Sequence, residues 1–217
     1  MKEKKVQKLI KRVFDIVASL LVLVSFLPVW VIVALFIKIT STGPIFFLQD
    51  RPGLNKKIFK VYKFRTMKPG SEKMVKGHEV MKDDNRITTI GKFLRRSKLD
   101  EIPQVLNVLK GEMSLVGPRP ERVESLSDYT NEMSKRLYMN PGMSGLAQVS
   151  GNIYLSLEDR YKLDVYYVEQ YSLWLDLRII IRTIGVVLFG EEKYVDKCLV
   201  EINLGFTEVA GTKEENA

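Results

Sequence analysis

The feature that most constrains the fold is a stretch of 22 residues, residues 16–37, that contains no charged side chain. At about 1.5 Å per residue, a straight helix of this length would just cross a hydrocarbon core of roughly 30 Å. Pro28 stands inside the stretch, where a proline removes a helix hydrogen bond and bends the axis. The sequence therefore predicts a membrane segment, and Pro28 argues against a simple straight crossing.

Basic residues flank this segment on both sides. Residues 1–12 hold six cations, and the segment is followed by Lys38, Arg51, Lys56 and Lys57. The charge asymmetry that normally sets the orientation of a membrane helix is therefore weak. A bent helix that enters and leaves by the same cytoplasmic face fits both the proline and the charges. A single-pass anchor stays open, whereas the lack of a small-residue cleavage site argues against a signal peptide.

Composition narrows the partners and the chemistry. The formal net charge of +8 favours an anionic partner, which is nucleic acid, a phosphorylated substrate or an anionic membrane surface. A single cysteine, Cys198, excludes an internal disulfide, and a single histidine, His78, excludes a multi-histidine metal site. Any metal should therefore be a hard ion on carboxylates, and we expect Mg²⁺.

Two adjacent carboxylates, Asp100 and Glu101, lie in residues 91–120 between the basic residues Arg95, Arg96 and Lys98 on one side and Arg119 on the other. Pro103 follows them at the head of a helix predicted over residues 104–109, so both acids should lie in or next to its first turn. Free backbone N–H groups and the helix dipole favour negative charge there. Asp100 should thus stay ionised, as a nucleophile or a cation ligand. The alternative is two ordinary acids on a solvated helix start.

Basic residues on either side of this pair suit phosphate binding. Arg119 lies between two prolines in a stiff turn, residues 117–120, and its planar guanidinium matches a phosphate. Residues 45–48 and 58–64 predict a β-hairpin whose second strand has an apolar face and a basic face containing Lys63, and Arg65 ends it. A solvated edge strand fits that pattern equally well.

The remaining segments predict helices and loops around this centre. Residues 68–90 are polar and predict a mobile loop of a kind that can serve as a lid, and residues 121–139 predict a polar helix. Residues 140–152 form a glycine-rich turn suited to close approach of a ligand. Residues 158–170 predict an amphipathic helix. Residues 173–189 predict an interfacial helix with aromatic anchors, and a packed core helix is equally compatible.

Together these segments predict an α+β fold that is mostly helical. A re-entrant membrane helix kinked at Pro28, a short β-hairpin and interfacial amphipathic helices should surround a compact cytoplasmic catalytic domain. The expected division is a basic N-terminus and membrane helix in residues 1–39, the catalytic domain in residues 40–204, and a flexible tail in residues 205–217.

Four motifs, taken in order and spacing, resemble a known family. FKVYKFRTM (59–67), RRSKLDEIPQVLNVLKGEMSLVGPRP (95–120), PGMSGLAQVSG (141–151) and LDVYYVEQYSLWLDL (163–177) are similar to the bacterial sugar transferases called monotopic polyprenol-phosphate phosphoglycosyl transferases. The resemblance covers nearly the whole chain from Arg12 to about Phe189 and looks like the minimal, catalytic-core form of that family.

The resemblance implies a reaction and a place for it. A sugar-1-phosphate would pass from a UDP-sugar to a polyprenol phosphate such as undecaprenyl phosphate, with release of UMP, as a first membrane step of polysaccharide or glycoconjugate assembly. The aspartate that attacks the β-phosphate in the family falls on Asp100, and Glu101 matches the second member of the acidic pair. The re-entrant helix implies the cytoplasmic face of the bacterial inner membrane, and a homodimer is compatible with the sequence.

The candidate site follows from these arguments. Asp100 and Glu101 are the catalytic candidates and would also hold Mg²⁺. The candidates for binding phosphate or substrate are Arg95, Arg96, Arg119, Lys63, Arg65 and Gln148. Arg95 and Arg119 match positions that hold phosphate in the family.

Three residues depart from the family pattern. Leu27 precedes Pro28 where the family often has serine, and Lys98 stands where threonine or serine is commoner. The family commonly reads NGRN where this chain has residues 150–153, SGNI, so that Asn152 stands in place of an arginine. The first and third departures bear on geometry and on the choice of donor, not on the reaction.

Two other functions use the same residues. A membrane-tethered scaffold that binds anionic lipid would explain the net charge, but not the acids inside the basic stretch. Nucleic acid is not expected as a partner, because no recognisable nucleic-acid module accompanies the charge. A Mg²⁺-dependent hydrolase of lipid or nucleotide diphosphates would differ from the transferase only in using water as the acceptor.

Overall fold

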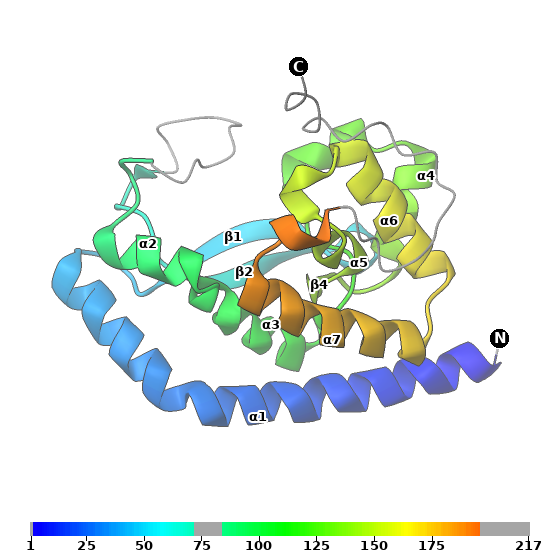
Figure 1. The fold of residues 1–217 in the computed structure, drawn as a ribbon, viewed down its shortest axis with the longest axis horizontal. Helices are drawn as coiled ribbons and strands as arrows, with labels where there is room; N and C mark the ends of the chain where they lie inside the picture. Colours follow the sequence, from blue (N-terminus) through cyan, green and yellow to red (C-terminus); the bar gives the residue numbers. More distant parts are fainter. Residues whose placement is uncertain (1, 72–83, 196–217) are drawn as a thin grey trace, which may run out of the picture.

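One long helix, α1 (Lys2–Thr40, 39 residues), runs along one side of the molecule. The computed structural model describes residues 2–71 and 84–195, and in Figure 1 α1 changes direction near its middle, so that it has two arms. Pro28 lies inside the helix, in agreement with the predicted kink. Among the described residues, α1 is the one helix that is long and apolar enough to cross a membrane.

The second arm of α1 packs against the predicted β-hairpin. Strands β1 (Phe46–Pro52) and β2 (Ile58–Phe64) pair antiparallel and are joined by the short 3₁₀ turn η1 (Leu54–Lys56). The hairpin prediction is confirmed, although the first strand begins one residue later and ends four residues beyond the predicted segment. Val33 and Ile37 of α1 are buried against Phe64 of β2 and Leu94 of helix α2 (Thr89–Arg96). Apolar contacts thus fix this arm.

Polar contacts, in contrast, hold the first arm. Lys11 Nζ lies 2.7 Å from Asp176 Oδ2 in helix α7 (Leu173–Phe189), and both side chains are buried. The hydroxyl of Tyr167, in helix α6 (Leu157–Glu169), donates to Asp176 Oδ1 at 2.7 Å. A buried ion pair is tolerated only when its hydrogen bonds are satisfied, and Tyr167 supplies one of them.

Two further charged residues of α1, one and four positions after Lys11, make hydrogen bonds to the rest of the protein. Arg12 donates to the carbonyl oxygens of Val108, at 2.5 Å, and Leu109, at 2.9 Å, at the end of helix α3 (Val105–Lys110). Asp15 accepts from Ser114 Oγ at 2.8 Å and from the next backbone N–H at 3.0 Å, at the start of strand β3 (Ser114–Val116). A cation at the carboxyl end of a helix satisfies carbonyls that have no partner within it.

A parallel strand pair lies at the centre of the main core. β3 pairs with β4 (Gly142–Ser144), and the core beside them is formed by α5 (Leu146–Val149), α6 and α7. After β3, the Gly117 N–H donates to Ser144 O, and the Gly142 N–H donates to Pro118 O, both at 2.9 Å. A Cβ atom at Gly117 or Gly142 would collide with backbone of the other segment, so this close approach requires both glycines.

The predicted helix over residues 121–139 is wrong as a single element. The chain instead forms three short turns, η4 (Val123–Asp128), α4 (Asn131–Ser134) and η5 (Lys135–Tyr138). Thr130 has an extended backbone, and its side chain accepts from Met133 N, so α4 begins there instead of continuing an earlier helix. Arg136 is drawn into the protein interior, which overrides the local pattern.

Several remaining segments border the centre of the molecule. The acidic pair lies in η3 (Leu99–Gln104), which contains Pro103, and α3 begins directly after it. The short turns η6 (Asn152–Tyr154) and η7 (Glu192–Tyr194) complete the described elements. Within the predicted loop over residues 68–90, residues 72–83 lie outside the described part, as does the predicted tail over residues 205–217. The lid and the tail therefore stay predictions.

Helix α7 was predicted to be either an interfacial helix or a packed core helix, and it has features of both. Leu175, Asp176 and Ile179 are buried against the core. The opposite side of the helix exposes large apolar side chains, namely Trp174, Leu177, Ile181, Ile184, Val187, Leu188 and Phe189. α7 runs beside the first arm of α1 (Figure 1), which exposes a comparable series that includes Leu9, Val13, Leu20 and Leu21. Both helices thus expose apolar side chains.

Candidate active site

The acidic pair lies where η3 packs against strand β2, and its two members have different surroundings. Glu101 accepts from Lys63 Nζ at 2.6 Å and from Arg119 Nη2 at 3.2 Å, both on the same carboxylate oxygen. Lys63 comes from β2, and Arg119 comes from the turn after β3. The structure therefore brings together four of the predicted residues, Asp100, Glu101, Lys63 and Arg119.

The two cations decide the ionisation of Glu101. Burial by itself would raise the pKa of Glu101, but Arg119 and Lys63 outweigh burial and hold that pKa well below its usual range. The Glu101 carboxylate in turn raises the pKa of Arg119. Burial lowers the pKa of Lys63, although Glu101 acts in the opposite direction. Glu101 is therefore a fixed negative charge that orients two cations.

Asp100 has no ion pair among the described residues. Burial and then the neighbouring Glu101 carboxylate raise the pKa of Asp100 to about 6, although Lys63 and Arg95 act in the opposite direction. The helix start was expected to favour the ionised form of Asp100. The backbone does act in that direction, but burial has a larger effect and raises the pKa. Asp100 is still mainly ionised at pH 7, and it is the more basic and less engaged carboxylate. Neighbouring carboxylates whose pKa values are pushed apart are typical of sites where they have separate roles.

A buried network behind Arg119 fixes its backbone. Arg136 Nη2 donates to the Arg119 carbonyl oxygen at 2.8 Å and pairs with Asp164, and the side chains of Arg136 and Asp164 are each 2% exposed. The Arg136 guanidinium also lies over the rings of Tyr161, at 4.4 Å, and Tyr129, at 5.6 Å. Arg136 and Asp164 were not among the residues predicted from the sequence, where each is only a charged residue next to apolar ones.

A further cation was also missed. Arg51, on β1, is near enough to Arg119 that burial and then the Arg119 charge lower the pKa of Arg51 to about 10. In the sequence, Arg51 stands out only as one of the charges that follow the apolar segment. Burial is the larger cause of this shift, and the contribution of Arg119 shows that the two guanidinium groups lie close enough to interact, an arrangement suited to an anion.

The other predicted binding residues are distributed around this centre. Arg95 Nε donates to Thr66 Oγ1 at 2.9 Å and is close enough to lower the pKa of Asp100. Arg96 is exposed. Gln148 donates to Met143 O at 3.1 Å, and its buried Oε1 has no hydrogen-bond partner among the described residues. Because this oxygen is buried, the structure does not show Gln148 in a position to bind a ligand, and its predicted binding role stays a prediction.

Arg65 has a different role from the one predicted for it. Its Nη2 donates to the carbonyl oxygen and the hydroxyl of Ser41, at 2.9 and 2.7 Å, just after α1 ends. The side chain is buried, and within the described residues its Nε and Nη1 have no hydrogen-bond partner. In the structure Arg65 therefore joins the end of the hairpin to the segment just after α1.

The acidic pair fits a magnesium ion that is shared with a substrate. Within residues 2–71 and 84–195, no group of three or more His, Cys, Asp or Glu side chains gathers to hold a metal. Mg²⁺ is commonly held by one or two carboxylates together with water and substrate phosphates, without a complete protein cage. Asp100 and the second oxygen of Glu101 are the ligands that the chain can offer to such an ion.

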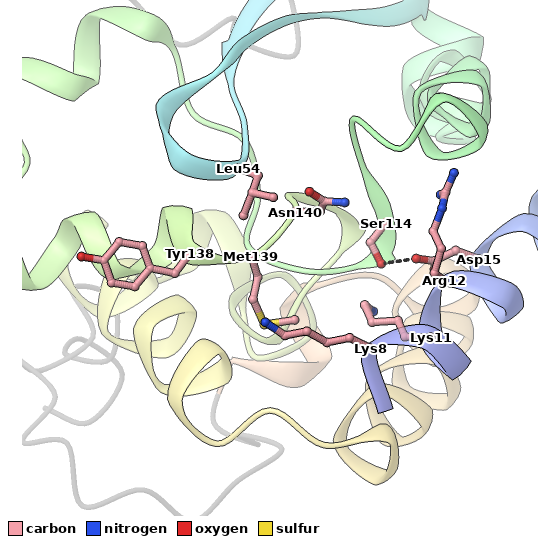
Figure 2. A pocket seen from close by; sticks show the side chains of 9 residues that line it. All are labelled: Lys8, Lys11, Arg12, Asp15, Leu54, Ser114, Tyr138, Met139 and Asn140. Atoms are coloured by element: carbon pink, nitrogen blue, oxygen red, sulfur yellow. Dashed lines mark hydrogen bonds between the residues drawn. The ribbon is translucent and has the colours of Figure 1, made fainter. Parts of the chain in front are cut away.

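A separate pocket of about 150 Å³ lies at the first arm of α1 and contains none of the candidate residues. Figure 2 shows the hydrogen bond between Asp15 and Ser114 at one side and the Lys8 side chain reaching towards Met139. The lining residues come from α1, η1, β3 and the segment at η5, and they are Lys8, Lys11, Arg12, Asp15, Leu54, Ser114, Tyr138, Met139 and Asn140. The docking contacts of α1 thus line this pocket.

Comparison with known proteins places the chain in a family. The sequence model described as "Bacterial sugar transferase" matches residues 6–190. An uncharacterized sugar transferase, EpsL, from Bacillus subtilis (strain 168) is 42% identical over 185 residues, which are 84% of this chain and 89% of that protein.

Two further relatives have names that state a reaction. The UDP-N-acetylgalactosamine-undecaprenyl-phosphate N-acetylgalactosaminephosphotransferase of Aeromonas hydrophila is 41% identical, over 83% of this chain and 44% of that protein. The undecaprenyl-phosphate glucose phosphotransferase of Komagataeibacter xylinus is 39% identical, over 85% of this chain and 37% of that protein. The chain thus spans less than half the length of these two relatives. The match over residues 6–190, together with these identities, shows that the chain belongs to the bacterial sugar transferase family.

Proposed function

We propose that this chain transfers a sugar-1-phosphate from a UDP-sugar to undecaprenyl phosphate or a similar polyprenol phosphate and releases UMP. The names of the A. hydrophila and K. xylinus relatives support the reaction class. The observation in the structure that carries the proposal is the unequal acidic pair, with Asp100 largely unengaged and Glu101 held by two cations. A scaffold that binds anionic lipid has no use for such a pair.

The proposed chemistry has two displacements at one phosphorus atom. A carboxylate oxygen of Asp100 attacks the β-phosphorus of the UDP-sugar, and the bond from that phosphorus to the bridging oxygen breaks, so that UMP leaves with the oxygen. An oxygen of the polyprenol phosphate then attacks the same phosphorus and releases the Asp100 carboxylate. The product is a polyprenol-diphospho-sugar. A carboxylate nucleophile thus divides one difficult transfer into two steps.

The surrounding cations match the charge that this chemistry develops. Arg119 and Lys63, which Glu101 holds in place, can receive the phosphate oxygens as negative charge grows on the leaving UMP. Donors that are already oriented need little reorganisation during the reaction. We assign Arg95 and Arg51 to the same cationic surroundings, because Arg95 lowers the pKa of Asp100 and Arg51 lies within the electrostatic influence of Arg119.

We further propose that α1 is re-entrant and that the chain lies at the cytoplasmic face of the inner membrane. Both arms of α1 contact the same domain, the first through Lys11 and Asp176 and the second through Val33 and Ile37. A straight crossing would place the two ends of the helix on opposite sides of the bilayer, where one domain could not hold both. The apolar side chains exposed on α1 and α7 would face the lipid.

The covalent step can be tested by withholding the acceptor. Purified protein mixed with a panel of UDP-sugars and no polyprenol phosphate should release about one UMP per active site and then stop, because the aspartyl-phosphosugar cannot turn over. Continuous UMP release would indicate a hydrolase instead. Asp100→Asn should abolish the release, whereas Asp50→Asn, which alters an exposed carboxylate on β1, should not.

The raised pKa of Asp100 predicts a pH dependence. The rate constant of UMP release in the burst should fall as the pH is lowered through the pKa of Asp100, and well below that pKa it should fall about tenfold per pH unit, as protonation removes the nucleophile. Because this folded-state pKa lies above the ordinary value of about 3.9, ionised Asp100 destabilises the fold above pH 6, and the effect is absent below pH 4. Asp100→Asn should therefore unfold at a higher temperature than the wild type at pH 7.5. A lower unfolding temperature for this variant would contradict the assigned environment.

We propose that Asp100 and Glu101 hold Mg²⁺ together with the donor phosphates, where the ion would neutralise charge on the diphosphate. EDTA should then stop UMP release, and Mg²⁺ should restore it. Ca²⁺ should restore little, because it is larger and accepts looser geometry. Full activity after exhaustive dialysis against EDTA would refute the metal assignment.

The re-entrant arrangement predicts that both ends of the described chain face the same side. In a Cys198→Ser background, single cysteines introduced as Lys5→Cys and Glu192→Cys should both react with a membrane-impermeant maleimide in inside-out vesicles. Neither should react in intact spheroplasts. Labelling of the two positions from opposite sides would establish a single crossing and overturn the proposal.

A further inference from the structure

The segment that follows α7 turns back against that helix. α7 ends at Gly190, whose φ of +89° favours glycine, and η7 follows directly. The ring of Tyr194 lies 4.2 Å from the guanidinium carbon of Arg182 and packs on Gly185, where a Cβ atom would collide with it. These contacts with α7 fix the turn and the side chain of Glu191 at its start.

The Glu191 carboxylate joins two segments of the candidate site that are far apart in the sequence. Its Oε1 accepts from Lys98 Nζ at 2.9 Å, and its Oε2 accepts from Asn152 Nδ2 at 2.9 Å. The Glu191 side chain is only 16% exposed, whereas that of Lys98 is 55% exposed. Each oxygen of this mostly buried carboxylate thus accepts one hydrogen bond, one from Lys98 and the other from Asn152.

Both residues that Glu191 holds have an unusual backbone. Lys98 has a φ of +58° and Asn152 a φ of +47°, in the left-handed region that residues other than glycine rarely adopt. The Lys98 carbonyl oxygen accepts from the Glu101 N–H at 3.2 Å, so the conformation of Lys98 sets the direction of η3. Such conformations persist where the surroundings over-determine them.

The two residues that Glu191 holds differ in charge. Lys98 is a cation, and Asn152 donates from a neutral amide, so the negative charge of Glu191 is balanced at this contact by Lys98. A cation from one segment and an amide from the other therefore meet at one carboxylate.

We propose that Glu191 is a positioning residue for the acidic pair, which fixes the turn carrying Asp100 and the Asn152 turn relative to each other. This inference rests on the proposed transferase function. Glu191 acts through Lys98 and Asn152 and needs no contact with the reacting atoms. The turn after α7 thereby becomes part of the catalytic arrangement, although it carries none of the family motifs.

Removal of the carboxylate should slow chemistry more than it weakens binding. Glu191→Ala should reduce the single-turnover rate of UMP release by about 10-fold to 100-fold, since small displacements at a reacting centre have effects of this size. The KM for the donor should change less than about threefold, and the unfolding temperature should stay close to that of the wild type. Glu192→Gln, which alters the exposed neighbouring acid, is the matched control and should retain the wild-type rate.

A charge exchange separates positioning from general damage to the fold. Lys98→Glu and Glu191→Lys should each slow UMP release, and the double variant should recover at least part of the rate because the ion pair is restored in reverse. A wild-type rate in Glu191→Ala, a loss explained by a lower unfolding temperature, or a double variant no faster than either single one would overturn the inference. If the wild type and Glu192→Gln release no UMP from any UDP-sugar, the proposed function fails instead.

Discussion

The buried ion pair between Lys11 and Asp176 fixes the long apolar helix α1 against helix α7 and the core beside it. Apolar contacts alone hold a helix in place weakly within a bilayer, because lipid tails satisfy apolar side chains as well as a protein core does. A charged pair differs, since a lone buried charge is strongly unfavourable. Lys11 pairs with Asp176 at 2.7 Å, and Tyr167 completes the arrangement. The helix therefore has one favourable position along α7.

This anchor leads directly to the candidate site through strand β3. Asp15, one turn after Lys11, holds Ser114 at the start of β3. The strand is followed at once by the Gly117 turn, whose backbone bonds to β4 and which places Arg119 on Glu101. A contact that holds α1 and the turn that carries Arg119 are thus only a few residues apart in the chain. The proposed reaction, with one substrate from lipid and the other from water, would benefit from such a rigid connection.

Local patterns in the sequence predicted the features that depend on neighbouring residues. Pro28 predicted the bend, alternation predicted the hairpin, and the charges around Asp100 predicted the centre of the site. The missed features depend on partners far apart in sequence. Arg136 and Asp164 are separated by 28 residues, and Glu191 lies 93 residues from Lys98. No periodicity relates such partners, so the helix predicted through Arg136 was wrong for a tertiary reason, and so was the expectation that the helix start sets the ionisation of Asp100.

The two adjacent carboxylates are chemically similar, and the sequence alone would allow them to exchange roles. Their surroundings remove that symmetry. Lys63 and Arg119 share one oxygen of Glu101, which reduces its tendency to attack an electrophile. Asp100 has no such partner among the described residues, and burial makes it the stronger base of the two. A nucleophile must give up its charge to a phosphorus atom, whereas a residue that orients cations must keep it. These opposite requirements favour Asp100 as the proposed nucleophile and Glu101 as the fixed charge beside it.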